Sequence, residues 1–388
     1  MTNAISPRAL ILGGGIGGVA TAIELRKINS TVDISVIDKE DCFTFTPAIY
    51  HTAAGELPEH RICVPLMNLF AKRRIRFLHD EVRLIDWKNN RIETANHEQI
   101  PYDYGVITLG AQTNYFNIAG MQEHSFALKT KHDAELLEEH LDEVIRRNQK
   151  TVFLVCGGGL TGVEYATDLQ DHLEKKSREK NADPALFQVE LVHGGERLLP
   201  EIPRAGDLAE KEIRSRGINL HLKSRVASVE DRAVVTTDGR RIYGDVIVWT
   251  GGLKMLEIIE KSGLPLVGGE NGGRATAGNG IGVNAFLQVV GQPQLFGVGD
   301  CVSPLNPEAR ALTLKTAWNA VREARIVAYN IAALIEKKPL KAFQPQAHPV
   351  AFTLGHRTGV LLIQNRLFSG IWVAWLKNTI EEWYVRTL

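Results

Sequence analysis

Cysteine is scarce in this chain and forms no motif. The 388 residues include only four cysteines, and none of them stands in a CxxC or metal-ligand spacing: Cys42, Cys63, Cys156 and Cys301. Such scattered residues argue against a disulfide framework, a zinc site and a dithiol redox centre, and they suit a reducing compartment. We therefore expect no metal, and we expect Cys156 and Cys301 to be packing residues.

A net charge and a long apolar run are also lacking. Lys and Arg number 45, as do Asp and Glu, so no overall charge attracts nucleic acid. No run of about 18 apolar residues exists, so we expect no membrane-spanning segment, and no secretory leader precedes the first apolar stretch. The 44% hydrophobic content and 35 glycines suit two or three domains with many tight turns.

The chain opens with an apolar stretch, a glycine turn and a helical pattern, "RALILGGGIGGVATAIELRK". Gly13, Gly15 and Gly18 have GxGxxG spacing, and Asp38 ends the next apolar stretch. The glycines allow a tight turn, backbone approach to a pyrophosphate and close packing of helix on strand. A carboxylate at position 38 can accept both hydroxyls of a ribose. The combination predicts a dinucleotide site.

The same plan returns as "TVFLVCGGGLTGVEYATDL" in the middle of the chain. Gly157, Gly159 and Gly162 repeat the spacing, but His193 stands where the ribose acid is expected. The loss of nucleotide binding in this half is the alternative to a second dinucleotide site, which the intact glycine loop favours. Arg197 is not placed clearly enough to indicate a 2′-phosphate, so we expect NADH in preference to NADPH.

Each glycine unit is followed by short alternating strands and a closing strand with a glycine turn, at Leu109-Gly110 and at Thr250-Gly251-Gly252. This internal repeat predicts an α/β protein with two Rossmann-like dinucleotide-binding domains of the glutathione-reductase type. Asp300 ends a later strand, "QPQLFGVGDCV", where an acid can bond a ribityl hydroxyl or simply form a turn. A helix is expected from about Thr313, and its N-terminal amides can face an electron-rich ring.

Glu164 lies near the start of the helix predicted after the second loop. A glutamate in a first helical turn is favourable through the helix dipole alone, by about 0.3–1 kcal/mol. An ionisable group beside a reacting ring is the alternative, and the residues themselves leave both open.

Five segments in this order resemble the flavoprotein reductases with two dinucleotide-binding domains: both glycine loops, "ITLGAQTNYFNIAG", "VWTGG" and "GVGDC". Within them the chain looks most like the type II NADH:quinone oxidoreductases, which are single-subunit NADH dehydrogenases that pump no protons. The resemblance covers nearly the whole chain, and "TFTPAIYHTAAGEL" is among its most specific pieces. It implies FAD, NADH and a quinone acceptor.

The resemblance assigns roles to individual positions. FAD would be bound by Gly13, Gly15, Gly17, Gly18, Asp38, Lys39, Pro47, Ala111, Asp300, Lys315 and Thr316. NADH would be bound by Gly157, Gly159, Leu160, Thr161, Gly162, Glu164, His193, Gly251 and Gly252. Glu164 and Lys315 would be catalytic, with Glu164 assisting quinone reduction or proton delivery. The implied domains are residues 1–120 and 271–345 for FAD, 121–270 for the nicotinamide nucleotide and 346–388 for membrane association.

One stretch departs from that family. Its usual Ala-Gln-x-Ala-x-Gln helix start reads "LKTAWNA" here, with Lys315 and Asn319 in place of the two glutamines. Lys315 can stabilise an anionic reduced ring or be a solvated surface charge. A sulfide:quinone or soluble-acceptor reductase is an alternative, although the sulfide enzymes depend on a cysteine pair that the scattered cysteines do not suggest. A flavin-binding interaction protein with little turnover is a further alternative, supported by His193.

The last 23 residues, 366–388, carry an apolar stripe at helical spacing: Leu367, Phe368, Ile371, Trp372, Trp375, Leu376, Trp383 and Tyr384. Arg366, Lys377 and Arg386 flank it. The stripe predicts an amphipathic segment on the cytoplasmic side of the cell membrane, as a peripheral enzyme needs to reach a lipid-soluble quinone. A helix packed on its own domain or across a homodimer interface is the alternative.

Overall fold

The chain folds as two compact units, and it passes from one to the other several times. The computed structural model describes residues 6–97, 99–179, 183–267, 280–305, 315–346 and 349–388. Unit 1 comprises residues 1–45, 63–112 and 253–347, and unit 2 comprises residues 46–62, 113–252 and 348–388. The segment 46–62 therefore leaves unit 1 and returns to it. The short strands β10 (Gln112–Thr113) and β19 (Leu253–Lys254) lie at two of the crossings.

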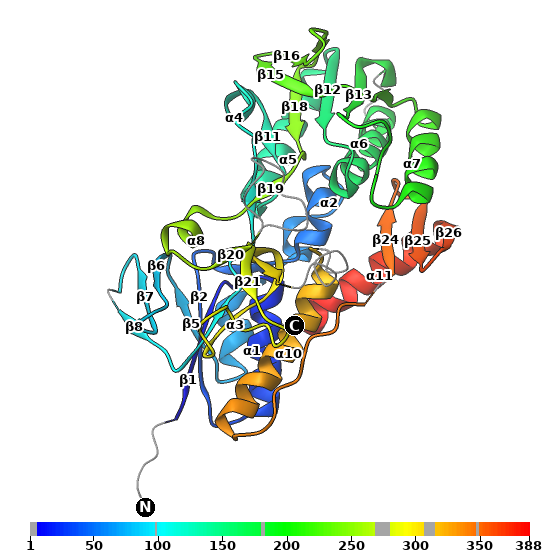
Figure 1. The fold of residues 1–388 in the computed structure, drawn as a ribbon. Helices are drawn as coiled ribbons and strands as arrows, with labels where there is room; N and C mark the ends of the chain where they lie inside the picture. Colours follow the sequence, from blue (N-terminus) through cyan, green and yellow to red (C-terminus); the bar gives the residue numbers. More distant parts are fainter. Residues whose placement is uncertain (1–5, 98, 180–182, 268–279, 306–314, 347–348) are drawn as a thin grey trace, which may run out of the picture. The chain divides into compact units, whose positions relative to one another are not determined.

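A parallel sheet of five strands forms the centre of unit 1 (Figure 1). Its order is β22-β9-β1-β2-β5, so the first strand lies in the middle, with Leu10 paired to Ser35 on one side and to Gly105 on the other. The strands are β1 (Arg8–Leu12), β2 (Asp33–Asp38), β5 (Arg76–His79), β9 (Tyr104–Ile107) and β22 (Leu295–Gly297). Leu10, Ile11 and Leu12 are all buried because both faces of such a sheet are covered.

Helices α1 (Ile16–Ile28) and α10 (Ala317–Ile335) pack side by side in unit 1 (Figure 1). The expected start of this second helix, Thr313, lies outside the described residues, and the described helix begins at Ala317 with Thr316 as its N-cap. The remaining elements of unit 1 are β3 (Cys42–Thr44), β4 (Cys63–Pro65), α3 (Leu66–Ala71), β6 (Val82–Asp86), β7 (Arg91–Thr94), β8 (Ile100–Pro101), α8 (Glu257–Lys261), β20 (Leu266–Val267), β21 (Gly280–Val283), η4 (Gly299–Cys301) and β23 (Val302–Pro304).

Unit 2 repeats the plan of unit 1. Its parallel sheet has the order β11-β18-β12-β13-β14, again with the strand before the glycine loop in the middle. The strands are β11 (Phe126–Ala127), β12 (Thr151–Cys156), β13 (Phe187–Val192), β14 (Asn219–His221) and β18 (Val246–Trp249). An antiparallel meander follows in each unit, β6-β7-β8 in the first and β15-β16-β17 in the second. The predicted pair of Rossmann-like domains is confirmed.

Helices and a second small sheet complete unit 2. The helix after the glycine loop, α6 (Leu160–Glu179), has 20 residues. The other elements are η1 (Thr46–Ala48), α2 (Ile49–Ala53), η2 (Glu59–Arg61), α4 (Met121–His124), α5 (Lys131–Arg147), η3 (Pro184–Leu186), α7 (Pro203–Ser215), β15 (Val226–Glu230), β16 (Ala233–Thr236), β17 (Arg241–Tyr243), β24 (Val350–Thr353), β25 (Gly359–Ile363), β26 (Arg366–Gly370) and α11 (Ile371–Thr387).

The C-terminal stripe differs from the expectation of one continuous helical pattern. Residues 366–370 form β26, and the helix α11 begins only at Ile371 (Figure 1). Leu367 and Phe368 therefore lie on a strand, because β26 continues the antiparallel sheet of β24 and β25. Among the described residues, no helix is both long and apolar enough to cross a membrane.

Candidate functional site

The first glycine loop has the geometry that its sequence predicts. Gly13 has φ +106°, and a Cβ on Gly18 would lie 1.8 Å from the Gly13 carbonyl oxygen. A Cβ on Gly15 would meet nothing within 4 Å, and no side chain caps α1 there. Uncapped amides at a helix N-terminus, with open space before them, suit a phosphate group. The loop therefore fits the pyrophosphate of a dinucleotide.

Asp38 stands at the end of β2 and points back to the loop. Its carboxylate accepts hydrogen bonds from the amides of Gly14 and Glu40. Burial raises the pKa of this carboxyl, and the two amide donors oppose that rise. Lys39 follows on the exposed side of the strand end.

The other residues predicted to bind FAD fall in two places. Asp300 follows β22, in the same sheet as the loop, and a Cβ on Gly17 would meet the Val298 side chain just before it. Ala111 follows the neighbouring strand β9. Lys315 and Thr316 line a small cavity in unit 1 together with Gly299, Val302, Asn319, Ala320 and Glu323. Pro47 belongs to η1 of unit 2, so its place against an FAD ring stays a prediction.

Glu323 is a buried carboxyl that the sequence analysis missed. It lies in α10, is 2% exposed and accepts a hydrogen bond from the Gly299 amide at 2.7 Å. Burial raises its pKa to about 8. Lys315 lines the same cavity and is partly buried, whereas a solvated surface charge would be exposed.

The second glycine loop matches the first in its steric details. Gly157 has φ +139°, and a Cβ on Gly162 would lie 1.9 Å from the Gly157 carbonyl oxygen. The Cβ position of Gly159 is again open. Leu160 and Thr161 form the first turn of α6, while Gly251 and Gly252 follow β18 of the same sheet. All the residues predicted to bind NADH are in unit 2.

His193 occupies the place of the ribose acid and makes the equivalent bond. It follows β13, and its Nδ1 accepts a hydrogen bond from the Gly158 amide at 3.1 Å. Burial lowers the pKa of this imidazole, so the neutral form is favoured. Because Nδ1 accepts, the proton of the neutral ring is on Nε2, which has no hydrogen-bond partner among the described residues.

The expected position of Glu164 in a first helical turn is wrong. Helix α6 begins at Leu160, inside the glycine loop, and no acidic residue lies in its first turn. Glu164 is therefore one turn further along, where the helix dipole contributes less. Its side chain is buried, at 6% exposure. Glu164 therefore does not lie where a carboxylate would stabilise the helix N-terminus through the helix dipole.

Three side chains from distant parts of unit 2 surround Glu164. Its Oε1 accepts hydrogen bonds from the Tyr50 hydroxyl at 2.7 Å and from the Thr353 amide at 2.9 Å. Lys377 Nζ donates to the Tyr50 hydroxyl at 2.7 Å and lies 3.7 Å from Glu164 Oε1. Lys377 also pairs with Glu381 at 2.9 Å. Tyr50 comes from α2, Thr353 from β24 and Lys377 from α11.

The charges in this cluster are set by burial and by neighbours. Burial raises the pKa of Glu164, and the nearby Lys377 ammonium partly offsets that rise. Burial alone would lower the pKa of Lys377, but Glu164 and Glu381 outweigh it and raise that pKa. Burial raises the pKa of Tyr50 well above its usual value. Lys377 thus keeps its proton, while burial makes the Glu164 carboxyl easier to protonate than an exposed one.

The sequence analysis missed most of this cluster. Lys377 was expected to flank the apolar stripe, but it is 8% exposed and points into unit 2. A lysine in the middle of an apolar helix pattern was the signal. Tyr50 lies in "TFTPAIYHTAAGEL", which was singled out as specific but not for this residue. Thr353 gave no signal, since a backbone amide is its main contribution.

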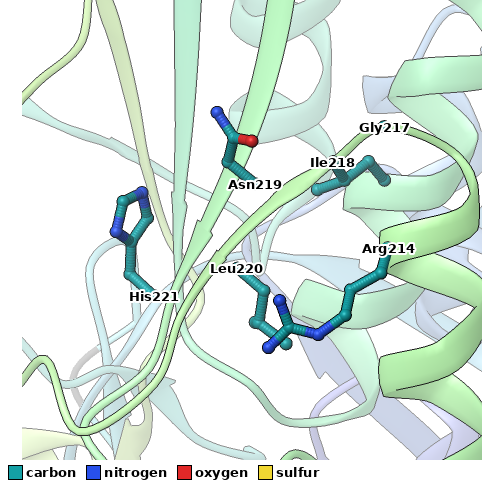
Figure 2. A pocket seen from close by; sticks show the side chains of 6 residues that line it. All are labelled: Arg214, Gly217, Ile218, Asn219, Leu220 and His221. Carbon is teal, nitrogen blue, oxygen red and sulfur yellow. The ribbon is translucent and has the colours of Figure 1, made fainter.

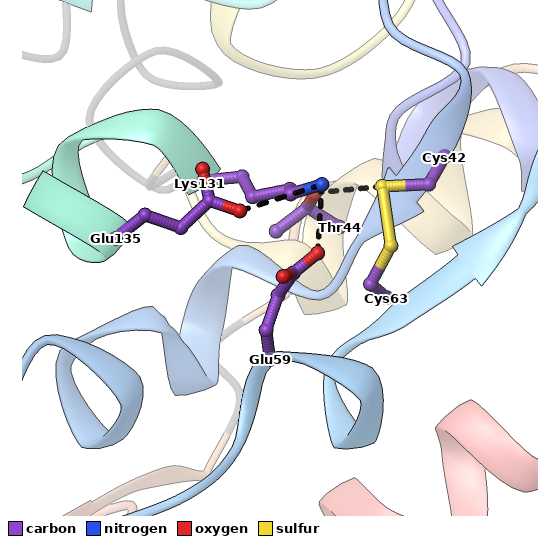
Figure 3. Close-up of a disulfide and its surroundings, with 6 residues drawn as sticks. All are labelled: Cys42, Thr44, Glu59, Cys63, Lys131 and Glu135. Atoms are coloured by element: carbon purple, nitrogen blue, oxygen red, sulfur yellow. Dashed lines mark hydrogen bonds and ion pairs between the residues drawn. A yellow bond between two sulfur atoms is a disulfide. The ribbon is translucent and has the colours of Figure 1, made fainter. Parts of the chain in front are cut away.

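The expectation of unpaired cysteines is wrong for two of the four. Cys42 and Cys63 form a disulfide between β3 and β4, with their Cα atoms 5.9 Å apart (Figure 3). The antiparallel pairing of these strands brings together residues that are 21 positions apart. The two cysteines lie in unit 1 just before and just after segment 46–62, so the disulfide ties together the two ends of the segment that belongs to unit 2. Cys156 and Cys301 are free and buried as expected, and burial raises the pKa of each thiol to about 12.

A shallow depression of about 380 Å³ lies elsewhere in unit 2 (Figure 2). It is formed at the edge strand β14 and the end of α7, and it is lined by Arg214, Gly217, Ile218, Asn219, Leu220 and His221. None of these is a predicted site residue. Among the described residues, no group of His, Cys, Asp or Glu side chains is arranged to hold a metal ion.

Two dinucleotide loops on two parallel sheets define the class of two-domain pyridine-nucleotide oxidoreductases. Comparison with known sequences agrees, since a model of the pyridine nucleotide-disulphide oxidoreductase family matches residues 7–324. The chain belongs to this family. Membership implies a flavin and a pyridine nucleotide as its redox partners.

Individual relatives are more specific. The chain is 27% identical to the demethylphylloquinone reductase NdbB of Synechocystis sp., over 93% of this chain and 87% of that one. It is 23% identical to a type II NADH:quinone oxidoreductase of Staphylococcus aureus, over 96% and 94%. The fold matches the structure of NDH2 from Plasmodium falciparum in complex with NADH, with a TM-score of 0.84 at 18% identity, covering 99% and 95%. The resemblance to type II NADH:quinone oxidoreductases is confirmed.

Proposed function

We propose that this protein is a peripheral membrane enzyme that passes electrons from NADH through FAD to a quinone. The observation that carries the proposal is the pair of glycine loops in one chain, of which only the second leads into a buried carboxyl, Glu164. The names of the relatives support NADH as the donor and a quinone as the acceptor. We propose further that the flavin is FAD and that the enzyme works at a membrane surface.

The chain's own residues have separate tasks in this reaction. The loop at Gly13–Gly18 and Asp38 bind the adenosine diphosphate part of FAD, and Asp300 bonds its ribityl chain. When bound, FAD supplies hydride acceptance and two-electron donation. The loop at Gly157–Gly162 binds NADH and orients its nicotinamide.

Glu164 holds a proton close to the reacting groups. Burial raises its pKa and so favours the protonated form, and the Tyr50 hydroxyl and Thr353 amide fix the position of its Oε1. Lys377 stabilises the carboxylate after the proton leaves, because it is a charged neighbour in a buried setting. Lys315 would supply positive charge to the flavin when the cofactor is bound.

Turnover with different acceptors tests this proposal. Purified protein is mixed with NADH and with menaquinone, ubiquinone or ferricyanide in separate assays, and in a further assay sulfide replaces NADH as the donor with a quinone as the acceptor. We expect yellow protein that reduces at least one quinone with NADH. Reduction of ferricyanide without reduction of any quinone would identify a soluble-acceptor reductase instead, and oxidation of sulfide would identify a sulfide enzyme.

The exposed aromatic side of α11 supports membrane binding. Trp372, Trp375 and Trp383 are 51%, 68% and 64% exposed, whereas Val373 and Ala374 pack on unit 2. Each large side chain gains about 1.5–3 kcal/mol when it is fully buried in an apolar phase. The same surface could be covered by a second copy in a homodimer, which is the alternative occupant.

Replacement of the three exposed tryptophans by serine tests the membrane part. A deletion of 366–388 would also remove β26 and the buried Lys377, so the triple variant is the cleaner choice. We expect it to lose sedimentation with phospholipid vesicles while it keeps NADH oxidation by ferricyanide. Tyr243→Ser, at another exposed aromatic residue, is the control. Unchanged vesicle binding with a change from dimer to monomer would favour the homodimer interface.

A further inference from the structure

Helix α6 carries three buried ionisable side chains at intervals of one turn. Glu164, Asp168 and His172 are spaced by four residues, so they lie along one side of the helix. They are 6%, 0% and 3% exposed. Ionisable groups are rarely buried without a partner, and three in one row are costly for a purely structural helix.

Side chains of α2 line the inner half of this row. His51 Nδ1 pairs with the Asp168 carboxylate. The His51 ring lies against the Tyr50 ring, with their centroids 4.2 Å apart. Tyr50 in turn donates to Glu164. Asp168 is therefore linked to Glu164 by its ion pair with His51, the ring contact between His51 and Tyr50, and the hydrogen bond from Tyr50 to Glu164. It also adds to the negative field at Tyr50 and Lys377.

The outer half of the row reaches the surface. His172 Nδ1 lies 3.3 Å from Glu56 Oε1, and His356 Nε2 lies 3.0 Å from Glu56 Oε2. The Glu56 side chain is 8% exposed, while that of His356 is 45% exposed. The carboxylate thus bridges a buried imidazole and a solvent-exposed one. The Glu56 carboxylate can accept a proton from His356 at Oε2 and pass a proton to His172 from Oε1.

Several polar atoms between α2 and α6 make no well-directed hydrogen bond among the described residues, although Asp168 and His172 lie within ion-pair distance of His51 and Glu56. They are Thr52 Oγ1, Glu56 Oε1, both Asp168 carboxylate oxygens, and both ring nitrogens of His172. Buried polar atoms are almost always paired, and ordered water is the usual partner where protein groups are missing. Water between His172 and Asp168 would span the one helical turn, about 6 Å, that separates them.

The proposed reaction requires one proton from solvent. NADH gives up a hydride, which is two electrons and one proton, and a quinone takes two electrons and two protons. Overall, NADH, a proton and quinone give NAD⁺ and quinol. Lys377 does not supply that proton, because its two carboxylate neighbours raise its pKa.

We propose that His356, Glu56, His172, Asp168, His51 and Tyr50 form the route by which the solvent proton reaches Glu164, with the Tyr50 hydroxyl as the group that donates to the carboxyl. The proposal rests on the proposed function for its purpose, but the route itself is a property of unit 2 alone. These residues are positioning residues, since they act on the quinone through Glu164.

Two conservative variants interrupt the route in different places. Asp168→Asn keeps the shape of the side chain and removes its ability to exchange a proton with His51. His172→Gln removes the imidazole that faces Glu56. Glu174→Gln is the matched control, because Glu174 is on the same helix but pairs with Arg178 at the surface. Each variant is first compared with the wild type by thermal unfolding.

The first measurement is the ratio of quinone turnover to ferricyanide turnover with NADH. Ferricyanide takes electrons without protons, so it reports the steps before proton delivery. We expect the ratio to fall at least about tenfold in Asp168→Asn and His172→Gln, within the range that general acid catalysis contributes. Glu174→Gln should keep the wild-type ratio. An unchanged ratio in both route variants would overturn the proposal.

The second measurement needs no acceptor. The carboxyl band of Glu164 in the infrared spectrum, assigned by its absence in Glu164→Gln, is followed after a rapid pH jump. A route predicts that Asp168→Asn slows the protonation of Glu164 and leaves the final level little changed. An electrostatic or packing role would change the final level without slowing it, and that result would contradict the route.

The two parts can fail separately. If wild-type protein reduces no quinone, the proposed function fails, and the pH jump still decides whether the route exists. If quinone is reduced but the jump is equally fast in all variants, only the route fails. Should Asp168→Asn not fold, His172→Gln and the surface variant His356→Gln carry the same two measurements.

Discussion

The two glycine loops of this chain are close copies in shape but differ in chemistry. A Cβ on Gly18 would lie 1.8 Å from the carbonyl oxygen of Gly13, and a Cβ on Gly162 would lie 1.9 Å from that of Gly157, so the two loops are equally tight at this position. In both units the residue at the end of the next strand accepts a hydrogen bond from the amide that follows the first glycine, which is Gly14 or Gly158. That residue is Asp38 in one unit and His193 in the other. The steric part of the dinucleotide site is repeated, and the ribose contact is not.

A second difference follows on the helix. Two residues after the third glycine, α1 carries Ala20 and α6 carries Glu164, and both positions are buried. Helix α1, which carries this small residue, packs against α10. The glutamate is supported by Tyr50, Thr353 and Lys377. The comparison agrees with the proposal that unit 1 holds FAD and that unit 2 binds NADH beside an ionisable group.

The largest expected effect comes from a methyl group at the shared close contact. Gly18→Ala and Gly162→Ala should each destabilise the protein by about 3 kcal/mol or more, because the contact is with backbone that cannot move aside. Thermal or denaturant unfolding measures this. Gly15→Ala and Gly159→Ala are matched controls with open Cβ positions, and equal losses in all four would contradict the steric equivalence of the loops.

The next effect concerns the glutamate that unit 1 lacks. Glu164→Gln keeps a similar shape but cannot hold an exchangeable acid proton, so quinone turnover should fall about 100-fold. Ferricyanide turnover with NADH should change little. The ratio of the two rates is the measurement, and a parallel fall in both would instead assign Glu164 to NADH binding.

A smaller effect is expected at the end of β13. His193→Glu restores a carboxylate that can accept the ribose hydroxyls and repel a 2′-phosphate, so the preference for NADH over NADPH should rise about tenfold. The preference is measured as the ratio of the two kcat/KM values. His193→Gln, which is uncharged, serves as control. A ratio that does not move would mean that β13 does not contact the ribose.

The smallest effect concerns the ion pair at the outer end of α6. Hydrogen bonding to Glu56 raises the pKa of His356 above its ordinary 6.5, while burial opposes and the two histidines lower the pKa of Glu56 below 4.5. The stabilisation from His356 is thus present below pH 6.5 and lost as pH rises through its higher folded value. That from Glu56 is lost as pH falls below 4.5.

His356→Gln should therefore flatten the decline of the unfolding temperature above pH 6.5. Because His356 is partly exposed, the difference should be under about 1 kcal/mol. The unfolding temperature is measured from pH 5 to pH 9 for the variant and the wild type, and a steeper decline in the variant would contradict this assignment of the pair.

Local pattern predicted the parts of this structure that depend on neighbours in sequence. The turns at Gly13 and Gly157, the strand ends at Asp38 and His193, and the long helix α6 follow from steric rules acting over a few residues. The exposed tryptophans of α11 were likewise visible as a periodic stripe. These features are repeated or periodic in the sequence, so they can be recognised without knowledge of distant contacts.

What the sequence did not reveal depends on contacts between distant segments. Tyr50 and Thr353 are 114 and 189 residues from Glu164, and nothing in their local sequence points to that carboxyl. Cys42 and Cys63 pair because β3 and β4 are antiparallel neighbours, not because of a motif. Helix α6 begins at Leu160, so Glu164 lies beyond its first turn, and this position changed the interpretation of the residue.

Anaerobic addition of NADH to the purified protein tests the central claim most directly, with the flavin colour as readout. The wild type should be yellow and lose that colour on mixing. Gly159→Asp places an anion in the open space of the second loop, so this variant should stay folded and yellow but bleach far more slowly. Wild-type protein that binds no flavin, or a variant that bleaches as fast as wild type, would contradict the assignment of one nucleotide to each loop.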